Sequence, residues 1–205
     1  MKGFFITFEG PEGCGKSTHV RHLAAYLRRK GYKVRSTREP GGTVIGENIR
    51  KLLLGTRRNM AHLAEVFLFM ADRRQHVEEM LLPTLKKGEV VICDRYADST
   101  VAYQVGGRKL DPKLIGQLCA VASYGLKPNL TFLLDISAGQ GLKRVDNSKY
   151  DYDRFESEQI SFHRRVRAKF LRLAKADPRR IKVIDSRQSI NAVQAEICRS
   201  VDRYL

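Results

Sequence analysis

The sequence predicts an α/β fold in which a five-stranded parallel sheet lies between two layers of helices. Five short, largely apolar runs are typical of strands buried on both faces, as in parallel sheets. Segments with helical spacing of apolar residues alternate with these runs, and no internal repeat or low-complexity tract interrupts them. A chain of 205 residues can bury one such core, so we expect a single domain over residues 1–205.

The elements follow one another along the chain. The first strand is expected at 3–9, around an apolar run, and the first helix at 16–30, where Gly31 ends it. A second strand at 33–37 leads into a Pro-Gly-Gly turn. The other strands, each a short apolar run, are expected at 89–93, 130–134 and 180–184. The other helices, each with helical periodicity, are expected at 43–54, 61–87, 98–105, 111–123, 138–145, 156–176 and 189–203. The polar stretch 146–155 is a local insertion.

One motif identifies a ligand. The segment from Gly10 to Thr18 fits G-x-x-x-x-G-K-[ST] between a strand and a helix. Backbone N–H groups and the helix N-terminus then point at one anion, as in the P-loop NTPase fold. Lys16 is expected to reach the outer phosphates of a nucleoside triphosphate, and the Ser17 hydroxyl to bind Mg²⁺. The triphosphate-binding residues are Gly10, Pro11, Glu12, Gly13, Cys14, Gly15, Lys16, Ser17 and Thr18.

The sequence indicates neither a membrane span nor an oxidising compartment. No apolar run approaches the roughly 18–20 residues of a span, and a strand at the very start leaves no room for a signal peptide. Cys14, Cys93, Cys119 and Cys198 are scattered without a C-x-x-C pair, which argues against a zinc site or a disulfide framework. We therefore expect a cytoplasmic protein.

The formal net charge of +16 is concentrated in one segment. Residues 164–182 contain nine Lys or Arg and one acid, Asp177. We favour a solvated basic helix face over a nucleic-acid footprint. The reason is that four residues recur at helical spacing and leave the arginines on the opposite face, namely His163, Val166, Phe170 and Leu173. No nucleic-acid partner is expected.

A second constellation follows the apolar strand at 89–93. Asp94 can hold Mg²⁺ beside Ser17, directly or through water, and Arg95 offers a planar fork to a phosphate. Asp135 ends another apolar strand and competes for the metal, but we assign it as a structural cap because Asp94 adjoins an arginine. Further polar side chains follow, namely Ser99, Thr100, Tyr103 and Gln104.

Two further segments predict an acceptor site. Arg38 precedes a Pro-Gly-Gly turn and a helix start, which indicates a second anion site. A switch protein that hydrolyses GTP or ATP does not need two phosphate sites, whereas a kinase with a phosphorylated acceptor does. Phe69 and Arg73 share one helix face, where they could stack on a base and hydrogen-bond its carbonyl. Taken alone, this segment favours core packing for Phe69 and a solvated Arg73.

Together these segments resemble the bacterial branch of the thymidylate kinase family. The resemblance is carried by residues 8–18, 37–43, 69–73, 94–104 and 153–156, which come in the family's order and span nearly the whole chain. It implies ATP- and Mg²⁺-dependent phosphorylation of dTMP to dTDP, in dTTP biosynthesis. It also implies a homodimer, for which the helices around 43–87 are a suitable surface.

The resemblance implies roles for individual side chains. Glu12 is similar to the family carboxylate near the 3′-hydroxyl of dTMP, and Tyr103 to the residue that packs against the deoxyribose and disfavours a 2′-hydroxyl. Arg38 and Arg95 resemble the ligands of the acceptor phosphate, and Phe69 would stack on thymine. The residues that would read the edge of the base are Arg73, Thr100 and Gln104.

The stretch 146–155 resembles the lid that closes over ATP and usually brings arginines to the transferring phosphate. Such an arginine is worth roughly 10³–10⁵ in rate. The matching position holds Lys149, so the catalytic cation could be Lys149, Arg144 at a helix end, or Arg154. The P-loop offers no substitute, because Gly13 stands where the eukaryotic branch has an arginine.

Cys14 is another departure, since the family often has alanine there. Amides that face a phosphate can lower the pKa of a thiol, but we favour a small residue that merely fits.

Three other functions compete with a dTMP kinase. A GTPase would show an Asn-Lys-x-Asp motif, which is absent from the sequence. A nucleic-acid-dependent ATPase would leave Arg38 and residues 94–96 unused. A kinase for another small acceptor is the main alternative. Thymine and uracil differ by one methyl group, worth only about 1–3 kcal/mol in a pocket, so the sequence does not predict the preference between dTMP and dUMP.

The lid assignment predicts a kinetic effect. Lys149→Ala is expected to lower kcat far more than it raises KM for ATP, because the cation acts on the transferring phosphate rather than on bound ATP. Steady-state kinetics at varied ATP would measure both. An unchanged kcat, together with loss of activity in Arg144→Ala, would refute the assignment of Lys149.

Overall fold

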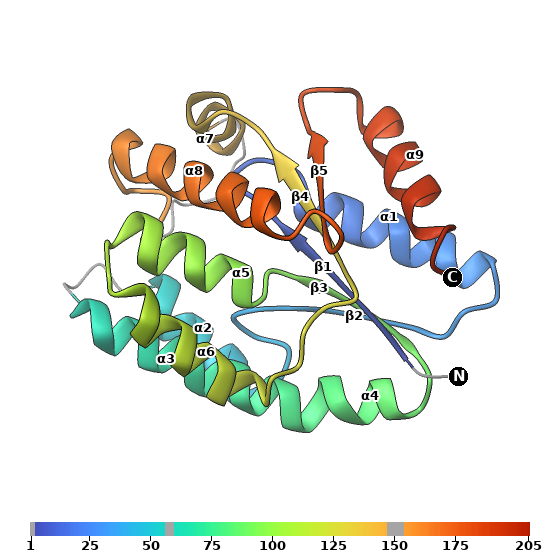
Figure 1. Ribbon diagram of the computed structural model, residues 1–205, viewed down its shortest axis with the longest axis horizontal. Helices are drawn as coiled ribbons and strands as arrows, with labels where there is room; N and C mark the ends of the chain where they lie inside the picture. Colours follow the sequence, from blue (N-terminus) through green and yellow to red (C-terminus); the bar gives the residue numbers. More distant parts are fainter. Residues whose placement is uncertain (1–2, 56–59, 147–153) are drawn as a thin grey trace.

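The computed structural model describes residues 3–55, 60–146 and 154–205. One sheet contains five strands in the order β2-β3-β1-β4-β5, and all neighbouring strands are parallel (Figure 1). The predicted parallel sheet is therefore confirmed. The strands are β1 (Phe4–Glu9), β2 (Val34–Arg38), β3 (Val90–Asp94), β4 (Leu130–Asp135) and β5 (Ile181–Asp185).

Helices cover both faces of the sheet (Figure 1). On one face α1 packs beside α9, and on the other η1, η2 and α8 pack against the strands. The helical elements among the described residues are α1 (Lys16–Arg29), α2 (Val44–Gly55), α3 (His62–His76), η1 (Val77–Leu81), α4 (Leu82–Lys86), α5 (Ala97–Thr100), η2 (Val101–Gly107), α6 (Pro112–Ser123), α7 (Ala138–Asp146), α8 (Ile160–Ala176) and α9 (Ile190–Val201).

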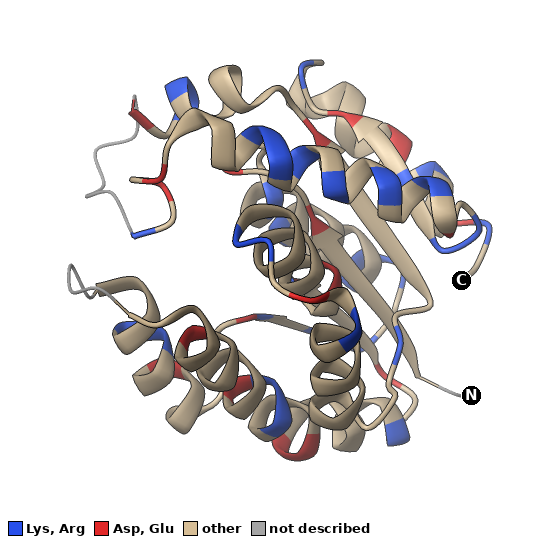
Figure 2. Ribbon diagram, turned by 60° about the vertical axis from the view of Figure 1, so that its left-hand side comes forward, with Lys and Arg blue, Asp and Glu red and all other residues tan. Residues whose placement is uncertain are grey.

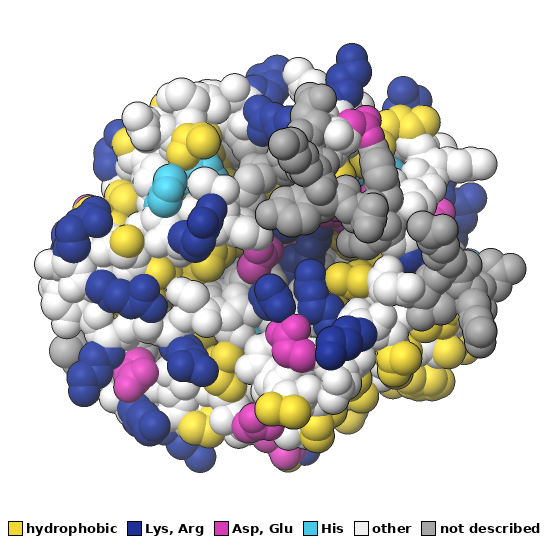
Figure 3. All heavy atoms as spheres, turned by 180° about the vertical axis from the view of Figure 1, so that it is seen from behind, with side chains coloured by type: hydrophobic (Ala, Val, Ile, Leu, Met, Phe, Trp, Pro, Cys, Tyr) yellow, Lys and Arg dark blue, Asp and Glu magenta, His cyan; other side chains and the backbone are white. Residues whose placement is uncertain are grey.

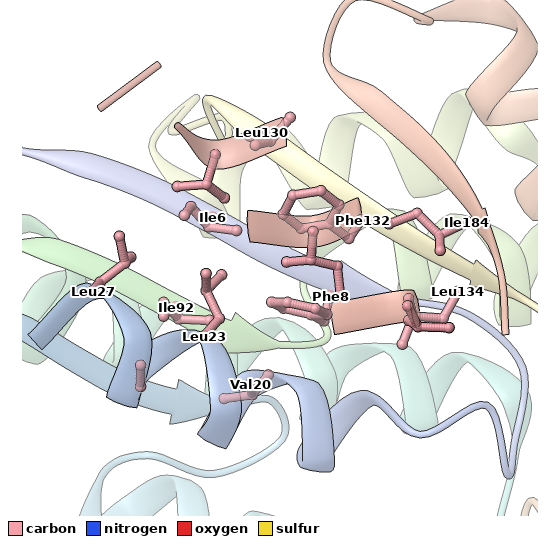
Figure 4. Packing of buried hydrophobic residues seen from close by; sticks show 14 of the residues in the cluster. Ile6, Phe8, Val20, Leu23, Leu27, Ile92, Leu130, Phe132, Leu134 and Ile184 are labelled. Carbon is pink, nitrogen blue, oxygen red and sulfur yellow. The ribbon is translucent and has the colours of Figure 1, made fainter. Parts of the chain in front are cut away.

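The core is formed by side chains that point alternately to the two faces of the sheet along each strand. Ile6 and Phe8 of β1 point to the face covered by α1, where they pack with Leu23 (Figure 4). Phe5 points the opposite way and packs on Val77 of η1. Because both faces of β1 are covered, its sequence is apolar throughout rather than alternating.

Three predicted helices differ in detail. The segment 61–87 and the segment 98–105 both contain π-helical stretches, η1 and η2. In η2 the chain approaches α8 closely, since a Cβ on Gly107 would lie 2.4 Å from the Phe162 ring. The helix expected from 156 begins instead at Ile160, after a turn at 154–157 in which the buried Phe155 packs on Tyr103.

The sheet topology determines where ligands bind. In a parallel sheet all carboxyl ends lie along one edge, and β1 lies between β3 and β4, where the strand order reverses. Ligands of open α/β sheets bind at that point. No helix of the described part of the chain is long and apolar enough to cross a membrane.

The buried sheet predicts a large cost for a cavity in β4. Phe132→Ala should lower the free energy of unfolding by about 3–5 kcal/mol, because Phe132 is fully buried. Val183→Ala on the neighbouring β5 is the control, and because Val183 is 46% exposed it should cost far less. Urea unfolding would measure both, and equal losses would contradict this account of the core.

Candidate active site

The phosphate-binding loop leaves β1 and enters α1 through conformations that favour glycine. Gly10, Gly13 and Gly15 have φ angles of 142°, 67° and 91°. At Gly13 a Cβ atom would also lie 2.1 Å from the carbonyl oxygen of Gly141, so α7 packs directly against the loop. The loop therefore ends at the amino-terminal turn of α1, whose free N–H groups attract an anion.

Lys16 and Ser17 lie in the first turn of α1. Lys16 is buried and its Nζ donates to the carbonyl oxygens of Pro11 at 2.9 Å and Gly10 at 3.3 Å. Ser17 Oγ donates to Asp94 Oδ2 at 2.6 Å, so the two predicted Mg²⁺ ligands are adjacent. Their oxygens are the ligand type that Mg²⁺ prefers, usually completed by substrate phosphates and water. Within the described ranges, no group of three or more His, Cys, Asp or Glu side chains could hold a metal ion.

A cavity of about 540 Å³ lies over the carboxyl ends of β1, β2 and β3. Figure 3 shows Lys and Arg side chains gathered around a hollow near the middle of this face. From the P-loop, the cavity is lined by Glu12, Gly13, Gly15, Lys16, Ser17 and Thr18, whereas Gly10, Pro11 and Cys14 are not among its lining residues. All predicted acceptor residues line it, namely Glu12, Arg38, Phe69, Arg73, Arg95, Thr100, Tyr103 and Gln104.

Glu12, Arg95 and Tyr103 form a hydrogen-bonded cluster in this cavity. Glu12 accepts from Arg95 at 2.6 Å and from the Tyr103 hydroxyl at 2.5 Å. Burial opposes a charge on Glu12, but the charges of Arg95 and Lys16 outweigh it and hold the pKa of Glu12 below its usual value. The left-handed backbone of Arg95, with φ of 70°, is a strain typical of functional sites.

Arg38 reaches the cavity from the end of β2. Its guanidinium NH2 group donates to both carboxylate oxygens of Glu47, at 3.0 and 3.1 Å. The register of β2 with β3 places Arg38 level with Asp94. Two arginines from neighbouring strand ends, Arg38 and Arg95, therefore line the same cavity as the P-loop.

The side of the cavity that faces α3 is aromatic. The ring of Phe69 lies 6.0 Å from that of Phe155, which lies 5.8 Å from that of Tyr103. Phe69 also packs against the core, so its packing and its position in the cavity occur together. These rings provide flat apolar surface on which a base can stack.

The segment around Arg73 suggested a solvated side chain, but this prediction is wrong, since Arg73 is only 2% exposed. The reason is a carboxylate buried beside it, because Nε donates to Glu39 at 2.8 Å. A second nitrogen donates to Thr100 Oγ1 at 2.9 Å, and the guanidinium lies 5.0 Å from the centre of the Tyr96 ring. These contacts fix the planar guanidinium at the cavity wall.

Gln104 is fully buried and has a single amide orientation. Its Nε2 donates to Glu65 Oε1 at 2.7 Å. Its Oε1 has no hydrogen-bond partner among the residues that the structure describes. Because Gln104 lines the cavity, it carries an acceptor that a ligand can satisfy.

A second network beneath the Pro-Gly-Gly turn was not foreseen from the sequence. Glu39 lies 2.9 Å from His76 Nδ1, and Asp72 accepts from the backbone N–H of Gly41 at 2.8 Å. Burial, reinforced by the charge of Glu39, raises the pKa of Asp72 to about 8. Both acids stand beside residues that the motifs singled out, but their burial cannot be read from the sequence.

The structure describes two of the three candidates for the catalytic cation. Arg144 lines the cavity, and its Nη1 donates to the carbonyl oxygen of Ser186 at 3.1 Å. Arg154 donates instead to Glu65 and to the carbonyl oxygen of Leu53, and it is not among the lining residues. Lys149 lies outside the described residues, as does most of the stretch 146–155.

Two other residues are consistent with structural roles. Asp135 accepts two hydrogen bonds of 2.8 Å from Arg167, so it is tied to α8 at the end of β4. Cys14 is 1% exposed, and burial raises the pKa of its thiol. The structure therefore favours a residue that fits over a reactive thiolate.

The basic segment lies largely along α8 (Figure 2). Its buried residues include His163, Val166 and Phe170, as the spacing predicts, while Leu173 is only partly buried. Arg164, Arg172 and Lys175 of this helix are exposed, whereas Arg167 is paired with Asp135. Beyond the helix, Arg180 is paired with Asp98 and Asp177.

Several cavity residues were given no role by the sequence analysis. They come from the turn after β2, from α2, from the segment around α5, and from the end of α7 and the turn before α8, so packing of separate elements brings them to the cavity. These residues are Glu39, Pro40, Arg50, Leu54, Tyr96, Ser99, Val145, Phe155 and Glu156.

Comparisons with known proteins agree on one family. The family model described as "Thymidylate kinase" matches residues 8–197. A thymidylate kinase from Bifidobacterium longum is 48% identical over 201 residues, covering 96% of each chain, and one from Protochlamydia amoebophila is 46% identical, covering 94% of this chain and 89% of that protein. The crystal structure of thymidylate kinase from Ehrlichia chaffeensis superposes with a TM-score of 0.80 and 34% identity, covering 98% of this chain and 99% of that one.

The buried acid beneath the turn predicts a pH dependence of stability. Between 3.8 and about 8, unfolded Asp72 is charged while folded Asp72 stays protonated, so the folded state loses stability as the pH rises. Relative to Asp72→Asn, the wild-type free energy of unfolding should fall by about 1.4 kcal/mol per pH unit across that range. Urea unfolding of both proteins at several pH values would measure the difference, and a difference independent of pH would contradict the shift.

Proposed function

Since the chain belongs to the thymidylate kinase family, we propose that the cavity over β1, β2 and β3 is where it transfers the terminal phosphoryl group of ATP to dTMP. The bond from the terminal phosphorus to the bridging oxygen of ADP breaks. A bond to an oxygen of the dTMP phosphate forms, and dTDP is the product. Such transfers depend mainly on positioning and on stabilising negative charge.

The donor side is the P-loop. Its backbone N–H groups and Lys16 would hold the phosphates of ATP, which would replace the carbonyl contacts of the Lys16 ammonium. Ser17 and Asp94 would hold Mg²⁺, since both offer oxygen atoms at the same point. When bound, Mg²⁺ would neutralise charge on the phosphate oxygens.

The acceptor side is formed by the two arginines and the cluster around Glu12. Arg38 and Arg95 would bind the dTMP phosphate with their planar guanidinium groups. Glu12 would accept from the 3′-hydroxyl, and Tyr103 would pack against the deoxyribose. The pKa of Glu12 is held low by its cationic neighbours, which keeps it in the acceptor form.

The observation that carries the assignment of the base is the unpartnered Gln104 Oε1. Thymine presents a ring N–H at N3 beside a carbonyl at C4. Gln104 offers an acceptor and Arg73 offers donors on the same cavity wall, where Phe69 supplies a ring for stacking. This arrangement complements thymine and uracil but opposes cytosine, in which N3 is an acceptor and C4 bears an amino group.

Arg144 is the described residue best suited to stabilise the transferring phosphate. It lines the cavity beside the P-loop, with Nη1 3.5 Å from the carbonyl oxygen of Gly13. The stretch 146–155 would act as a lid within the single domain and bring Lys149 as a second cation. Arg154 would instead support the acceptor side of the cavity, because it donates a hydrogen bond to Glu65.

We also propose that the protein is a cytoplasmic homodimer. Helix α3 packs between α2 and α6, and all three carry exposed apolar side chains. Val44 of α2 is 80% exposed, Phe67 of α3 56% and Val121 of α6 69%. A surface of this kind is typical of a contact with a second copy.

A panel of nucleoside monophosphates tests the proposed acceptor site. We expect ATP-dependent ADP release with dTMP, and a kcat/KM for dUMP lower by about 10–200-fold, because one methyl group is missing. For dCMP we expect a loss of at least about a hundredfold, because Gln104 and Arg73 then face the wrong partners.

Gln104→Leu should narrow the gap between dTMP and dCMP, because it removes the acceptor for N3–H. A coupled assay for ADP release would measure each substrate. Equal turnover of dTMP and dCMP by the unmodified protein would refute this assignment.

A further inference from the structure

We propose that Glu65 is a positioning residue that fixes the amide orientation of Gln104 and thereby selects a base with N3–H over cytosine. The inference rests on the proposed function, in which Gln104 contacts the base. It adds a residue behind the cavity wall, because Glu65 lies in the first turn of α3, is fully buried and does not line the cavity.

The orientation follows from the chemistry of the contact. A carboxylate only accepts hydrogen bonds, whereas an amide can donate from nitrogen or accept through oxygen. Glu65 Oε1 lies 2.7 Å from Gln104 Nε2, so the amide must turn its nitrogen toward Glu65. The oxygen is then left buried and without a partner among the described residues, on a side chain that lines the cavity.

Two arginines keep Glu65 in this role. Arg108 donates to both of its oxygens, at 3.3 and 3.4 Å, and Arg154 donates to Oε2. Arginine has no acceptor, so these contacts can be made only by a group that presents oxygen. They make the buried carboxylate tolerable and leave Oε1 directed at Gln104.

On this wall of the cavity, both groups that are proposed to read the base are oriented by buried carboxylates. Glu39 orients the Arg73 guanidinium, and Glu65 orients the Gln104 amide. A flipped amide would present N–H to the N3–H of thymine, which is a donor facing a donor. The same flip would suit the N3 lone pair of cytosine, so the orientation of Gln104 controls discrimination at this position.

Glu65→Gln tests the proposal with a nearly isosteric change. The oxygen of the new amide should take the place of Oε2, which accepts from both Arg154 and Arg108. Its NH2 group then takes the place of Oε1, loses the 3.4 Å contact with Arg108 Nε, and faces Gln104, so the Gln104 amide is driven to flip. The ratio of kcat/KM for dTMP to kcat/KM for dCMP should then fall by about ten- to a hundredfold. Loss of stability alone would lower both values together and leave the ratio unchanged.

Glu158→Gln is the matched control. It removes the other acidic partner of Arg108 without touching Gln104, so the ratio should remain that of the unmodified protein. Glu65→Asp covers the case in which the amide variant fails to fold. It keeps the charge between the two arginines but withdraws the oxygen from Gln104, so a smaller fall in the ratio is expected.

The Gln104→Leu variant separates this inference from the proposed function. If Gln104→Leu lowers the ratio while the folded Glu65 variants do not, Gln104 reads the base without help from Glu65 and the inference is wrong. If Gln104→Leu leaves the ratio unchanged, Gln104 does not select the base, so the proposed contact and the inference that rests on it are both wrong. An equal fall in Glu158→Gln and Glu65→Gln would also overturn the inference, because disturbance of Arg108 alone would then explain it.

Discussion

Each arginine expected to bind the acceptor is held by a carboxylate, and the site depends on that pairing. A buried guanidinium without a partner would be costly, whereas a paired one keeps its position and leaves some N–H groups for a ligand. The pair deepest in the protein is 2% and 3% exposed, so water does little to weaken it. The three pairs are Arg38 with Glu47, Arg73 with Glu39 and Arg95 with Glu12.

The strand order brings these pairs to the P-loop. β3 lies between β2 and β1, so Asp94 at its end is level with both Arg38 and Phe8. The loop begins just beyond β1, and Ser17 therefore reaches Asp94 although 77 positions separate them in the chain. A different strand order would leave the same motifs intact but would separate the donor site from the acceptor site.

The same contacts explain how the site can exchange partners during the reaction. Lys16 rests on backbone carbonyl groups, and Arg95 rests on Glu12 and Ser99. Phosphate oxygens are stronger acceptors than the carbonyls, so binding can redirect the Lys16 ammonium without moving the backbone. Arg95 has five N–H donors and can add a phosphate contact to those it makes already. The groups proposed to read the base differ, because Arg73 and Gln104 are held by the buried carboxylates Glu39 and Glu65 and offer one arrangement only, which favours specificity over adaptability.

The sequence by itself determined the order of strands and helices along the chain and the P-loop, because apolar periodicity and glycine-rich spacing act locally. The set of acceptor residues came instead from the resemblance to the family. The segment around Arg73 by itself favoured a solvated side chain, and the sequence gave no role to Glu39, Glu65 or Asp72. Those properties were decided by the tertiary structure alone, since they depend on which side chains meet across α3, η2 and the turn after β2. Burial changes what a carboxylate does, and burial is a property of the packed chain rather than of any segment.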